Sequence, residues 1–257
     1  MGIGINDVSR AFIKKTFRNS IQLLCIEMNA ELCRFLQNTV FTSSLFTIET
    51  ESSSNNLNKV LSSSIHHCWL LDLTSSNNKN RLHDVLVEKR YPFCVALVVT
   101  IEDAIRAAKA GAYWCYDKND IAVDKLNLFI NDVCSLAALS FLLRGHAVSN
   151  GCFIKLVTHF VETPEEWARE NFFSFRTLFN LCKISSGMSP KYFLSLYHAI
   201  RFTLLCDCLS ENHAEYTSIT KNMVQHAFFY RKCMEFVRKK QPVCNETEPG
   251  DGYETMG

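Results

Sequence analysis

The stretch AIRAAKAGAYWCYDKN (residues 104–119) decides the fold that this sequence predicts. Its first half has helical spacing, with Ile105 and Ala108 three residues apart, and Gly111 is suited to end that helix. A short aromatic strand, YWCY, follows at once and stops just before Lys118. A helix, a glycine and an apolar strand complete a βα unit, so the lysine lies just past the carboxyl end of a strand.

The same alternation of strands and helices runs through residues 20–142. Apolar strands are expected at IQLLCI, SLFTIET, HCWLLDL, FCVALVVT and YWCY, with helical spacing between them and after the last. Strands that are apolar at nearly every position are typical of a parallel sheet covered by helices on both faces. We therefore expect an α/β fold with a doubly wound sheet of five parallel strands.

Composition narrows the class of protein. The 257 residues are 47% hydrophobic and 21% charged, with a net charge of +1, which fits a globular protein and excludes a uniformly basic one. The longest apolar run, near residues 134–143, is about half of the ~20 residues that span a bilayer. The amino-terminal residues carry charges where a signal peptide needs its apolar core. We expect a cytoplasmic protein that does not bind membranes.

Cysteine and histidine residues do not predict a metal site. The twelve cysteines lie mostly within apolar stretches and form no C-x-x-C motif, so we expect reduced cysteines in the core. His66, His67 and Cys68 are adjacent, but they immediately precede a strand, in which neighbouring side chains point to opposite faces. The sequence therefore predicts no metal and no cofactor.

Four polar residues follow the predicted strands. Their order along the chain is Glu27, Asp72, Thr100 and Lys118. Because the carboxyl ends of parallel strands meet at one edge of a sheet, these side chains are expected on one rim. Two carboxylates, a hydroxyl and an ammonium group suit a phosphoryl or Mg²⁺ site, and they are equally compatible with ordinary turn residues.

The segments LLCIEMNAELCRFL, WLLDLTS and AIRAAKAGAYWCYDKN resemble, in order and spacing, the receiver domain of bacterial response regulators. The resemblance implies a flavodoxin-like fold. It places Asp72 at the family's phospho-accepting aspartate, Thr100 at its switch residue and Lys118 at its lysine. It covers about half of the chain.

Two positions of the receiver pattern, a Mg²⁺ ligand and a proline, are occupied by other residues in this sequence. The family places two adjacent acids after its first strand to hold Mg²⁺, whereas here the pair is Glu27 and Met28, and a thioether is a poor ligand for that ion. Asn119 stands where the family has proline. We therefore expect a degenerate receiver without a Mg²⁺ site, in which Lys118 pairs with Asp72 and Glu27. Phosphorylation of Asp72 by a two-component kinase is the alternative.

The second part of the chain is predicted to be helical. Thr163 and Pro164 start a helix that ends near Asn171. Ser174 starts a second helix that ends at Gly187, and a third helix opens at residues 189–190. Two short helices joined by about three residues have the layout of a helix-turn-helix.

The second helix has two distinct predicted faces. The expected buried stripe is Phe175, Leu178, Phe179 and Cys182. The opposite side carries Arg176, Thr177, Asn180 and Lys183. Arginine bonds guanine bidentately and asparagine does the same for adenine, and no acid lies between residues 171 and 206. The face suits the major groove of DNA; an ordinary solvated face is the alternative.

A second resemblance concerns the same segment. Eight residues carry it: Thr163, Ala168, Ser174, Arg176, Leu178, Gly187, Ser189 and Pro190. They resemble the first helix-turn-helix of AraC/XylS-type transcription regulators, which implies that the helix at 174–186 enters the major groove. The second helix-turn-helix of that family would lie at 218–240, where the match is poor. Lys191, Arg231 and Lys232 are expected to contact phosphates.

These observations define five predicted segments. They are an N-terminal segment (1–19), a receiver-like domain (20–142), a linker (143–152), an AraC-type helix-turn-helix domain (153–241) and an acidic disordered tail (242–257). We expect a DNA-binding transcription regulator, not an enzyme, whose receiver is a phospho-independent dimerisation and regulatory module. The apolar helix at 124–142 predicts a homodimer. DNA binding is then constitutive or tuned by a regulatory protein partner. The alternatives are phosphorylation control through Asp72 and an adaptor that antagonises another regulator.

Overall fold

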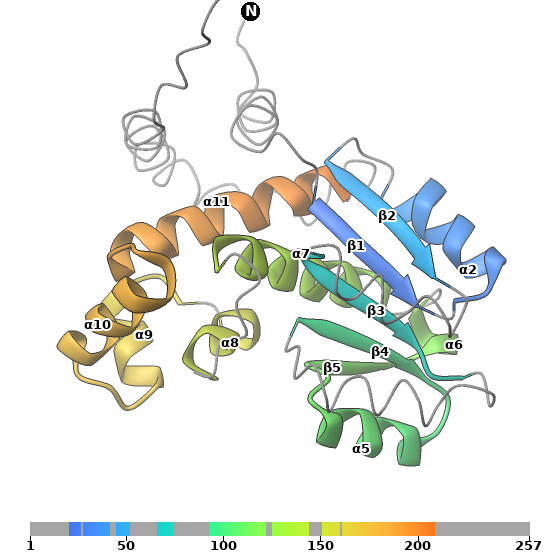
Figure 1. Ribbon diagram of the computed structural model, residues 1–257, viewed down its shortest axis with the longest axis horizontal. Helices are drawn as coiled ribbons and strands as arrows, with labels where there is room; N and C mark the ends of the chain where they lie inside the picture. The colour runs from blue at the N-terminus through green and yellow to red at the C-terminus, as the bar shows by residue number, and fades with distance from the viewer. Residues whose placement is uncertain are drawn as a thin grey trace, which may run out of the picture.

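A computed structural model describes residues 21–26, 28–41, 45–51, 66–74, 93–121, 125–143, 151–159 and 161–208 (Figure 1). Its strands are β1 (Ile21–Ile26), β2 (Phe46–Glu51), β3 (Cys68–Asp72), β4 (Cys94–Val98) and β5 (Trp114–Asp117). They form one parallel sheet in the order β2-β1-β3-β4-β5. The predicted α/β fold with five parallel strands is confirmed, and the strand order is that of flavodoxin-like sheets.

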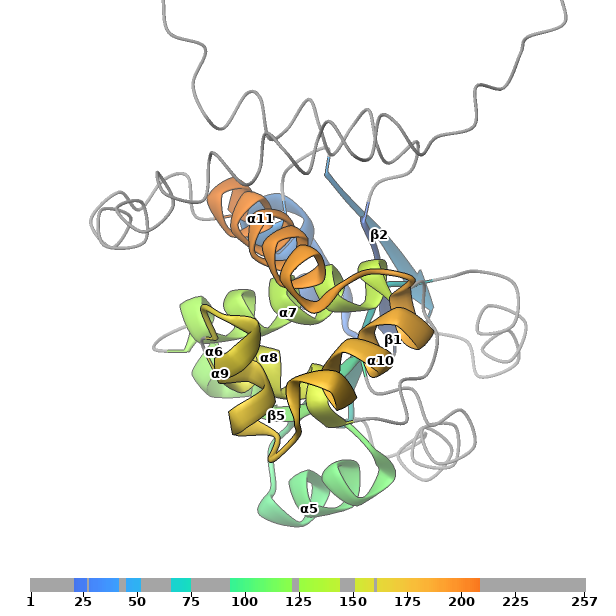
Figure 2. The same ribbon diagram turned by 90° about the vertical axis from the view of Figure 1, so that its left-hand side faces the viewer.

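Helices surround the sheet and extend beyond it. The helical elements are α2 (Ala30–Phe35), the π-helical turn η1 (Leu36–Val40), α5 (Ile101–Ala110), α6 (Lys118–Ile121), α7 (Leu126–Leu142), α8 (Gly151–Thr158), α9 (Pro164–Glu170), α10 (Phe175–Ser186) and α11 (Pro190–Cys208). Figure 1 shows α9 and α10 at the end of α11 that lies away from β2, and Figure 2 views them from that side. None of the helices in the described ranges is long and apolar enough to cross a membrane.

Alternating strand residues build two hydrophobic cores, one on each face of the sheet. One face contributes Leu23, Cys25, Leu70, Val95 and Leu97, which pack with residues of α2 and α7. The other contributes Leu24, Ile26, Leu71, Ala96 and Val98, which pack with alanines of α5. Since side chains alternate along a strand, burial on both faces requires apolar residues throughout, which is the pattern in β3 and β4, whereas most of the edge strand β2 is exposed or half-buried.

The fold-deciding stretch forms the elements that its residues predict. Thr100 caps α5, and its hydroxyl oxygen accepts a hydrogen bond of 3.2 Å from the Asp103 backbone N–H. Gly111 ends the helix at φ +105°, in the left-handed region that favours glycine. β5 then begins at Trp114 and includes Asp117, one residue later than predicted.

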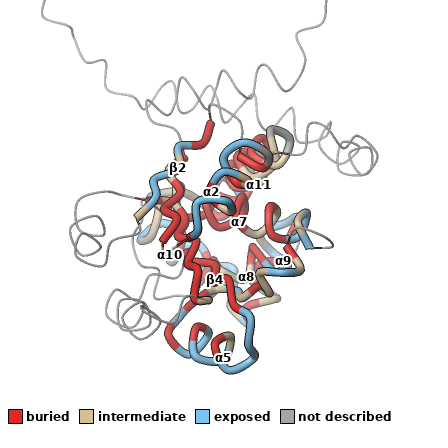
Figure 3. The backbone as a smooth tube through the Cα atoms, turned by 90° about the vertical axis from the view of Figure 1, so that its right-hand side faces the viewer, coloured by how far each residue is buried: buried red, intermediate tan, exposed pale blue. Residues whose placement is uncertain are grey.

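The apolar helix α7 is covered on both sides within the chain. Its buried residues surround the helix axis, and they include Phe129, Val133 and Leu136. One side packs on the sheet and another packs against α8 and α11. Figure 3 shows α7 buried over most of its length. The excess apolar surface from which a homodimer is predicted is therefore occupied by the chain's own helices.

One of the two hydrophobic cores, the one on the α7 side of the sheet, extends into the helices α8–α11. The cluster that begins under β1 continues through α7 to Trp167, Leu178 and Tyr197. α8 begins at Gly151, within the residues predicted as a linker (143–152). The predictions for residues 1–19, 218–240 and 242–257, and for the helices between β2 and β3 and between β3 and β4, lie outside the described residues.

Candidate functional site

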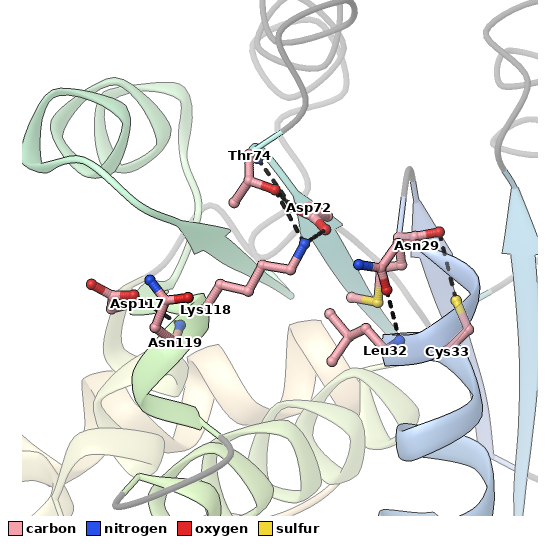
Figure 4. Close-up of polar contacts among 9 residues, drawn as sticks. Asn29, Leu32, Cys33, Asp72, Thr74, Asp117, Lys118 and Asn119 are labelled. Carbon is pink, nitrogen blue, oxygen red and sulfur yellow. Dashed lines mark hydrogen bonds and ion pairs between the residues drawn. The ribbon is translucent and has the colours of Figure 1, made fainter.

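An ion pair joins the carboxyl ends of β3 and β5. Asp72 is the last residue of β3 and is only 2% exposed, whereas Lys118 begins α6 directly after β5. The Lys118 Nζ donates to the Asp72 Oδ2 over 2.6 Å (Figure 4). The predicted pairing of these two residues is present. Glu27, the other expected partner of Lys118, lies outside the described residues.

Thr74 completes the surroundings of the Asp72 carboxylate. The Asp72 Oδ1 accepts from the Thr74 backbone N–H at 3.0 Å and from its hydroxyl at 2.6 Å. Lys118 also donates to the Thr74 hydroxyl oxygen at 3.2 Å. Both carboxylate oxygens are therefore hydrogen-bonded, which a buried charge requires. Sequence reasoning missed Thr74, although a threonine two residues after an aspartate is suited to such a local turn.

Thr100 has its hydrogen bonds at the start of α5. Its hydroxyl donates to the Asp103 Oδ2 at 2.8 Å while accepting from the Asp103 backbone. This reciprocal arrangement is a helix cap. Three of the four predicted rim residues are described, and hydrogen bonds join Asp72 to Lys118, whereas Thr100 bonds to its own helix.

The described residues beside the ion pair do not fit a Mg²⁺ site. Met28 is buried and offers a thioether, which Mg²⁺ does not favour. Asn29 caps α2, where its side-chain oxygen accepts from the Leu32 backbone at 2.7 Å (Figure 4). Within the described ranges, no group of three or more His, Cys, Asp or Glu residues could hold a metal ion.

The adjacent histidines that precede β3 point to separate partners. The His66 Nε2 lies 2.9 Å from the Glu49 Oε2, and the His67 Nδ1 accepts from the Gln22 backbone N–H at 3.0 Å. The His67 ring also stacks on Phe141, with centroids 5.4 Å apart. Burial, with a smaller effect of His66, lowers the pKa of His67 to about 4. These histidines hold structural positions.

The helices α9 and α10 are joined by a short turn with well-formed caps. Thr163 caps α9, and the Ser174 hydroxyl oxygen accepts from the Thr177 backbone N–H at 3.1 Å to cap α10. Gly187 ends α10 at φ +71°. These predicted boundaries are confirmed, and α11 begins at Pro190 as expected. The caps satisfy free backbone groups at the helix ends and so define where α9 and α10 begin.

The buried stripe of α10 is narrower than predicted. Leu178 and Cys182 are buried, but Phe175 is 47% exposed and Phe179 is 38% exposed. The prediction for these two phenylalanines was wrong, because α10 packs against α9 and α11 along one side only, and residues near the edge of that side stay in contact with solvent. The exposed surface of α10 is therefore partly aromatic.

The predicted DNA-reading residues lie on the exposed side of α10. Arg176, Thr177, Asn180 and Lys183 are all exposed. The Lys183 ammonium lies 5.9 Å from the Phe179 ring centroid and 3.3 Å from the Gly187 carbonyl oxygen. Lys191, on the first turn of α11, is exposed as well, whereas Arg231 and Lys232 lie outside the described residues.

Phe172, in the turn before α10, has an unusual conformation. Its backbone φ is +56°, and its side chain is 95% exposed. The Lys155 ammonium lies 5.7 Å from the centroid of this ring and donates to the Glu170 carbonyl oxygen at 2.7 Å. A non-glycine residue in the left-handed region is destabilising, and an exposed ring gains little from burial. Sequence reasoning missed this residue.

A polar network connects β5 to α11 through α7. The Tyr116 hydroxyl donates to the Asp132 Oδ2 at 2.6 Å, and the Asn131 Nδ2 lies 3.3 Å from the Asp132 Oδ1. The Arg201 guanidinium donates to the Asn131 Oδ1 at 2.7 Å. Burial raises the pKa of Asp132, and burial together with the hydrogen bond to Asp132 raises the pKa of Tyr116. The sequence contains no motif that predicts this network.

Comparisons with known proteins find no significant match to this chain among protein-family models, curated proteins or solved structures. The fold therefore defines its class: an α/β protein with a five-stranded parallel sheet, whose core continues into a set of helices.

Proposed function

We propose that this protein is a bacterial, cytoplasmic transcription regulator that binds double-stranded DNA through α10. In this proposal, α9 and α10 are the helix-turn-helix of an AraC-type domain, and the sheet is a degenerate receiver. The protein acts by binding and catalyses no reaction.

The observation that carries the proposal is the exposed face of α10. Arg176, Asn180 and Lys183 lie exposed on one helix whose ends are fixed by Ser174 and Gly187. No acidic residue occurs between residues 171 and 206, so no carboxylate from this segment opposes a phosphate backbone. A capped, exposed helix with positive and amide side chains suits the width and chemistry of the major groove.

Each residue on this face has a distinct role in the proposal. Arg176 pairs bidentately with guanine and Asn180 with adenine, which supplies sequence information. Lys183 is a further base contact on the same face. Lys191 contacts phosphates, which gives affinity without sequence information. The Thr177 hydroxyl lies 2.9 Å from that of Ser174, so its contact with DNA is made beside the cap of α10. Arg231 and Lys232 are proposed as further phosphate contacts.

The receiver-like part is proposed to act without phosphorylation. The pair formed by Asp72 and Lys118 gives both carboxylate oxygens a partner, and the described neighbours offer no Mg²⁺ site. The alternative is control through phosphorylation of Asp72. Beryllofluoride with Mg²⁺ distinguishes them: unchanged intrinsic fluorescence and DNA affinity support phospho-independent action, and a saturable change supports the alternative.

The proposed regulator is a homodimer. A homodimer is expected because paired half-sites are the usual targets of helix-turn-helix proteins. The α7 surface is covered by α8 and α11, so the dimer contact is placed on other surfaces. Size-exclusion chromatography with light scattering measures the mass directly, and a monomeric mass at working concentration would exclude a stable dimer.

The proposal is tested by fluorescence anisotropy on promoter fragments at several salt concentrations. The wild-type protein should prefer some fragments over others, and Arg176→Glu should abolish that preference. The matched control is Lys109→Glu, which makes the same change in charge at an exposed position on α5. It should leave affinity within about twofold, since it lies outside the proposed contact region.

Two further variants distinguish residues that contact bases from residues that contact phosphates. Asn180→Ala should lower the preference for the favoured fragment by about 1–3 kcal/mol. Lys191→Ala should weaken all fragments alike and reduce the slope of log affinity against log salt by about one. Weak, sequence-independent binding that ignores Arg176→Glu would overturn the proposal and favour an adaptor that binds another protein.

A further inference from the structure

Two thiols meet where α11 packs on α7, and we infer that Cys134 and Cys208 form an oxidative modification site. Under oxidation they would close into a disulfide that ties the end of α11 to the middle of α7. This inference does not depend on DNA binding, because it concerns only the contact between the two helices.

The geometry brings together residues that are far apart in sequence. The Cys134 Sγ and the Cys208 Sγ lie 4.0 Å apart, across a separation of 74 residues. A disulfide has an S–S length of about 2.05 Å, so the two sulfurs must approach by about 2 Å. That distance is within the range of a side-chain rotation combined with a small shift of one helix end.

The two cysteines differ in how easily they move and react. Cys134 is fully buried in the middle of α7, whereas Cys208 is partly exposed and is the last residue of α11. Two turns before Cys208, Arg201 is bonded to Asn131, which keeps the two helices in register. A rotation of the Cys208 side chain can therefore bring the sulfurs closer while α11 stays in place.

Most of the other described cysteines are poorly placed for this chemistry. Burial raises the pKa of Cys94 and Cys182 to about 12 and that of Cys152 to about 11. Such thiols rarely form the reactive thiolate. Cys115 is the other partly exposed cysteine in the described ranges, and its thiol donates to the Ala104 carbonyl at 3.5 Å.

A peroxide is the oxidant class that this arrangement suits. The Cys208 thiol attacks one oxygen of hydrogen peroxide, which yields a sulfenic acid and releases water. The Cys134 sulfur then attacks the Cys208 sulfur, the S–O bond breaks, and a second water leaves with the thiol proton. The two thiols lose two electrons in total, and these reduce the peroxide. An exposed reactive cysteine next to a buried resolving cysteine matches this order of events.

The disulfide would change the protein in a defined way. It would fix α11 to the sheet, and since α10 packs on α11, it would also restrict the position of α10. A loop of this length, once closed, loses unfolded-state entropy, so the oxidised protein should melt roughly 5–10 °C higher.

The experiment uses the full chain, treated with hydrogen peroxide, then unfolded in guanidinium chloride with N-ethylmaleimide so that all free thiols, including buried ones, are blocked. Trypsin should release the peptide at 126–144, which contains Cys134, joined to the peptide at 202–221, which contains Cys206 and Cys208. Cleavage before Asp207 then separates these last two cysteines. The expected result is a cross-link from Cys134 to Cys208. Dithiothreitol should break the cross-link and return the melting temperature to that of the reduced protein.

Single substitutions test whether Cys134 and Cys208 are the two cysteines that form the disulfide. Cys208→Ser should abolish the cross-link and the reversible gain in melting temperature, whereas Cys115→Ser, at the other partly exposed position, should leave both unchanged. Cys134→Ala should remove the cross-link and leave Cys208 as an overoxidised or blocked thiol. Recovery of Cys134 fully labelled after oxidation, or a cross-link that persists in Cys208→Ser, would overturn the inference.

Discussion

Arg201 on α11 donates a hydrogen bond of 2.7 Å from its Nη2 to the side-chain oxygen of Asn131 on α7. The contact continues from Asn131 to Asp132, whose other oxygen accepts from the Tyr116 hydroxyl. The helical part is therefore attached to the sheet by a polar network as well as by the shared hydrophobic core. Such networks specify one geometry, because a partly satisfied alternative leaves polar groups buried without partners.

The first prediction concerns this bond between Arg201 and Asn131. Arg201→Met should keep the packing of the side-chain stem while removing the hydrogen bond, and Asn131→Ala should remove its acceptor. In a double-mutant cycle measured by urea unfolding, the coupling free energy should be about 1 kcal/mol. The loss in Arg201→Met is limited because the substitution also removes the buried Nε, which has no hydrogen-bond partner among the described residues. Strictly additive effects would show that the contact does not stabilise the interface.

The second prediction concerns the asymmetry of the ion pair between Lys118 and Asp72. Lys118→Met leaves a carboxylate buried without a counter-charge and should lower the free energy of unfolding by about 3 kcal/mol. Asp72→Asn should cost less, about 1 kcal/mol, because the more exposed ammonium group can regain water. Urea unfolding of both variants measures the difference. Equal costs would show that burial of Asp72 does not dominate this contact.

The third prediction concerns the pH dependence of stability through His67. Its pKa is about 4 in the folded protein against an ordinary value of 6.5, because the ring is buried and, to a smaller extent, because His66 lies beside it. Above pH 6.5 neither the folded nor the unfolded state binds the proton. As the pH falls from 6.5 to about 4, the unfolded chain gains a proton that the folded ring excludes, so this contribution to stability is progressively lost.

This loss should reach about 2–3 kcal/mol near pH 4. Urea unfolding at pH 7, 5.5 and 4 measures it. His67→Gln should flatten the pH profile in that window, and His159→Gln, at an exposed position, should leave the profile as in the wild type. A wild-type profile that His67→Gln does not change would contradict the assignment.

The sheet was predictable because its signals are local and repeated. Apolar strand runs and the glycine at 111, which ends α5, are signals that lie within a few residues of the elements they define. The boundaries of α9 and α10 follow from similar local signals at Thr163 and Ser174. In each case the residue that starts or ends the element bonds to its own helix, so its effect is independent of the rest of the fold.

The tertiary contacts were not predictable for the opposite reason. The apolar excess of α7 correctly indicates that something covers this helix, but its sequence does not distinguish a second copy from the chain's own α11. Phe175 and Phe179 fit a buried stripe by spacing, yet their exposure depends on how much of α10 its neighbours cover. The bond from Arg201 to Asn131 spans 70 residues, and neither residue carries a local sign of the other.

The last prediction concerns backbone strain on either side of α10. Phe172→Gly should raise the free energy of unfolding by about 1 kcal/mol, because glycine adopts φ +56° without the clash that a Cβ causes. Gly187→Ala should lower it by about 1 kcal/mol, since the φ there is +71° and no neighbouring atom gives the added methyl group a contact. The two variants form a matched pair, measured by urea unfolding.

The same variants connect strain to the proposed function. Residues with strained backbones are often found at functional sites. The Phe172 ring is exposed in the turn that precedes α10, beside Lys155. If α10 binds DNA, Phe172→Gly should weaken binding in the anisotropy assay while stabilising the protein. Because the variant is more stable, weaker binding cannot be attributed to unfolding. A variant that is more stable and binds DNA equally well would show that the strained ring has no part in recognition.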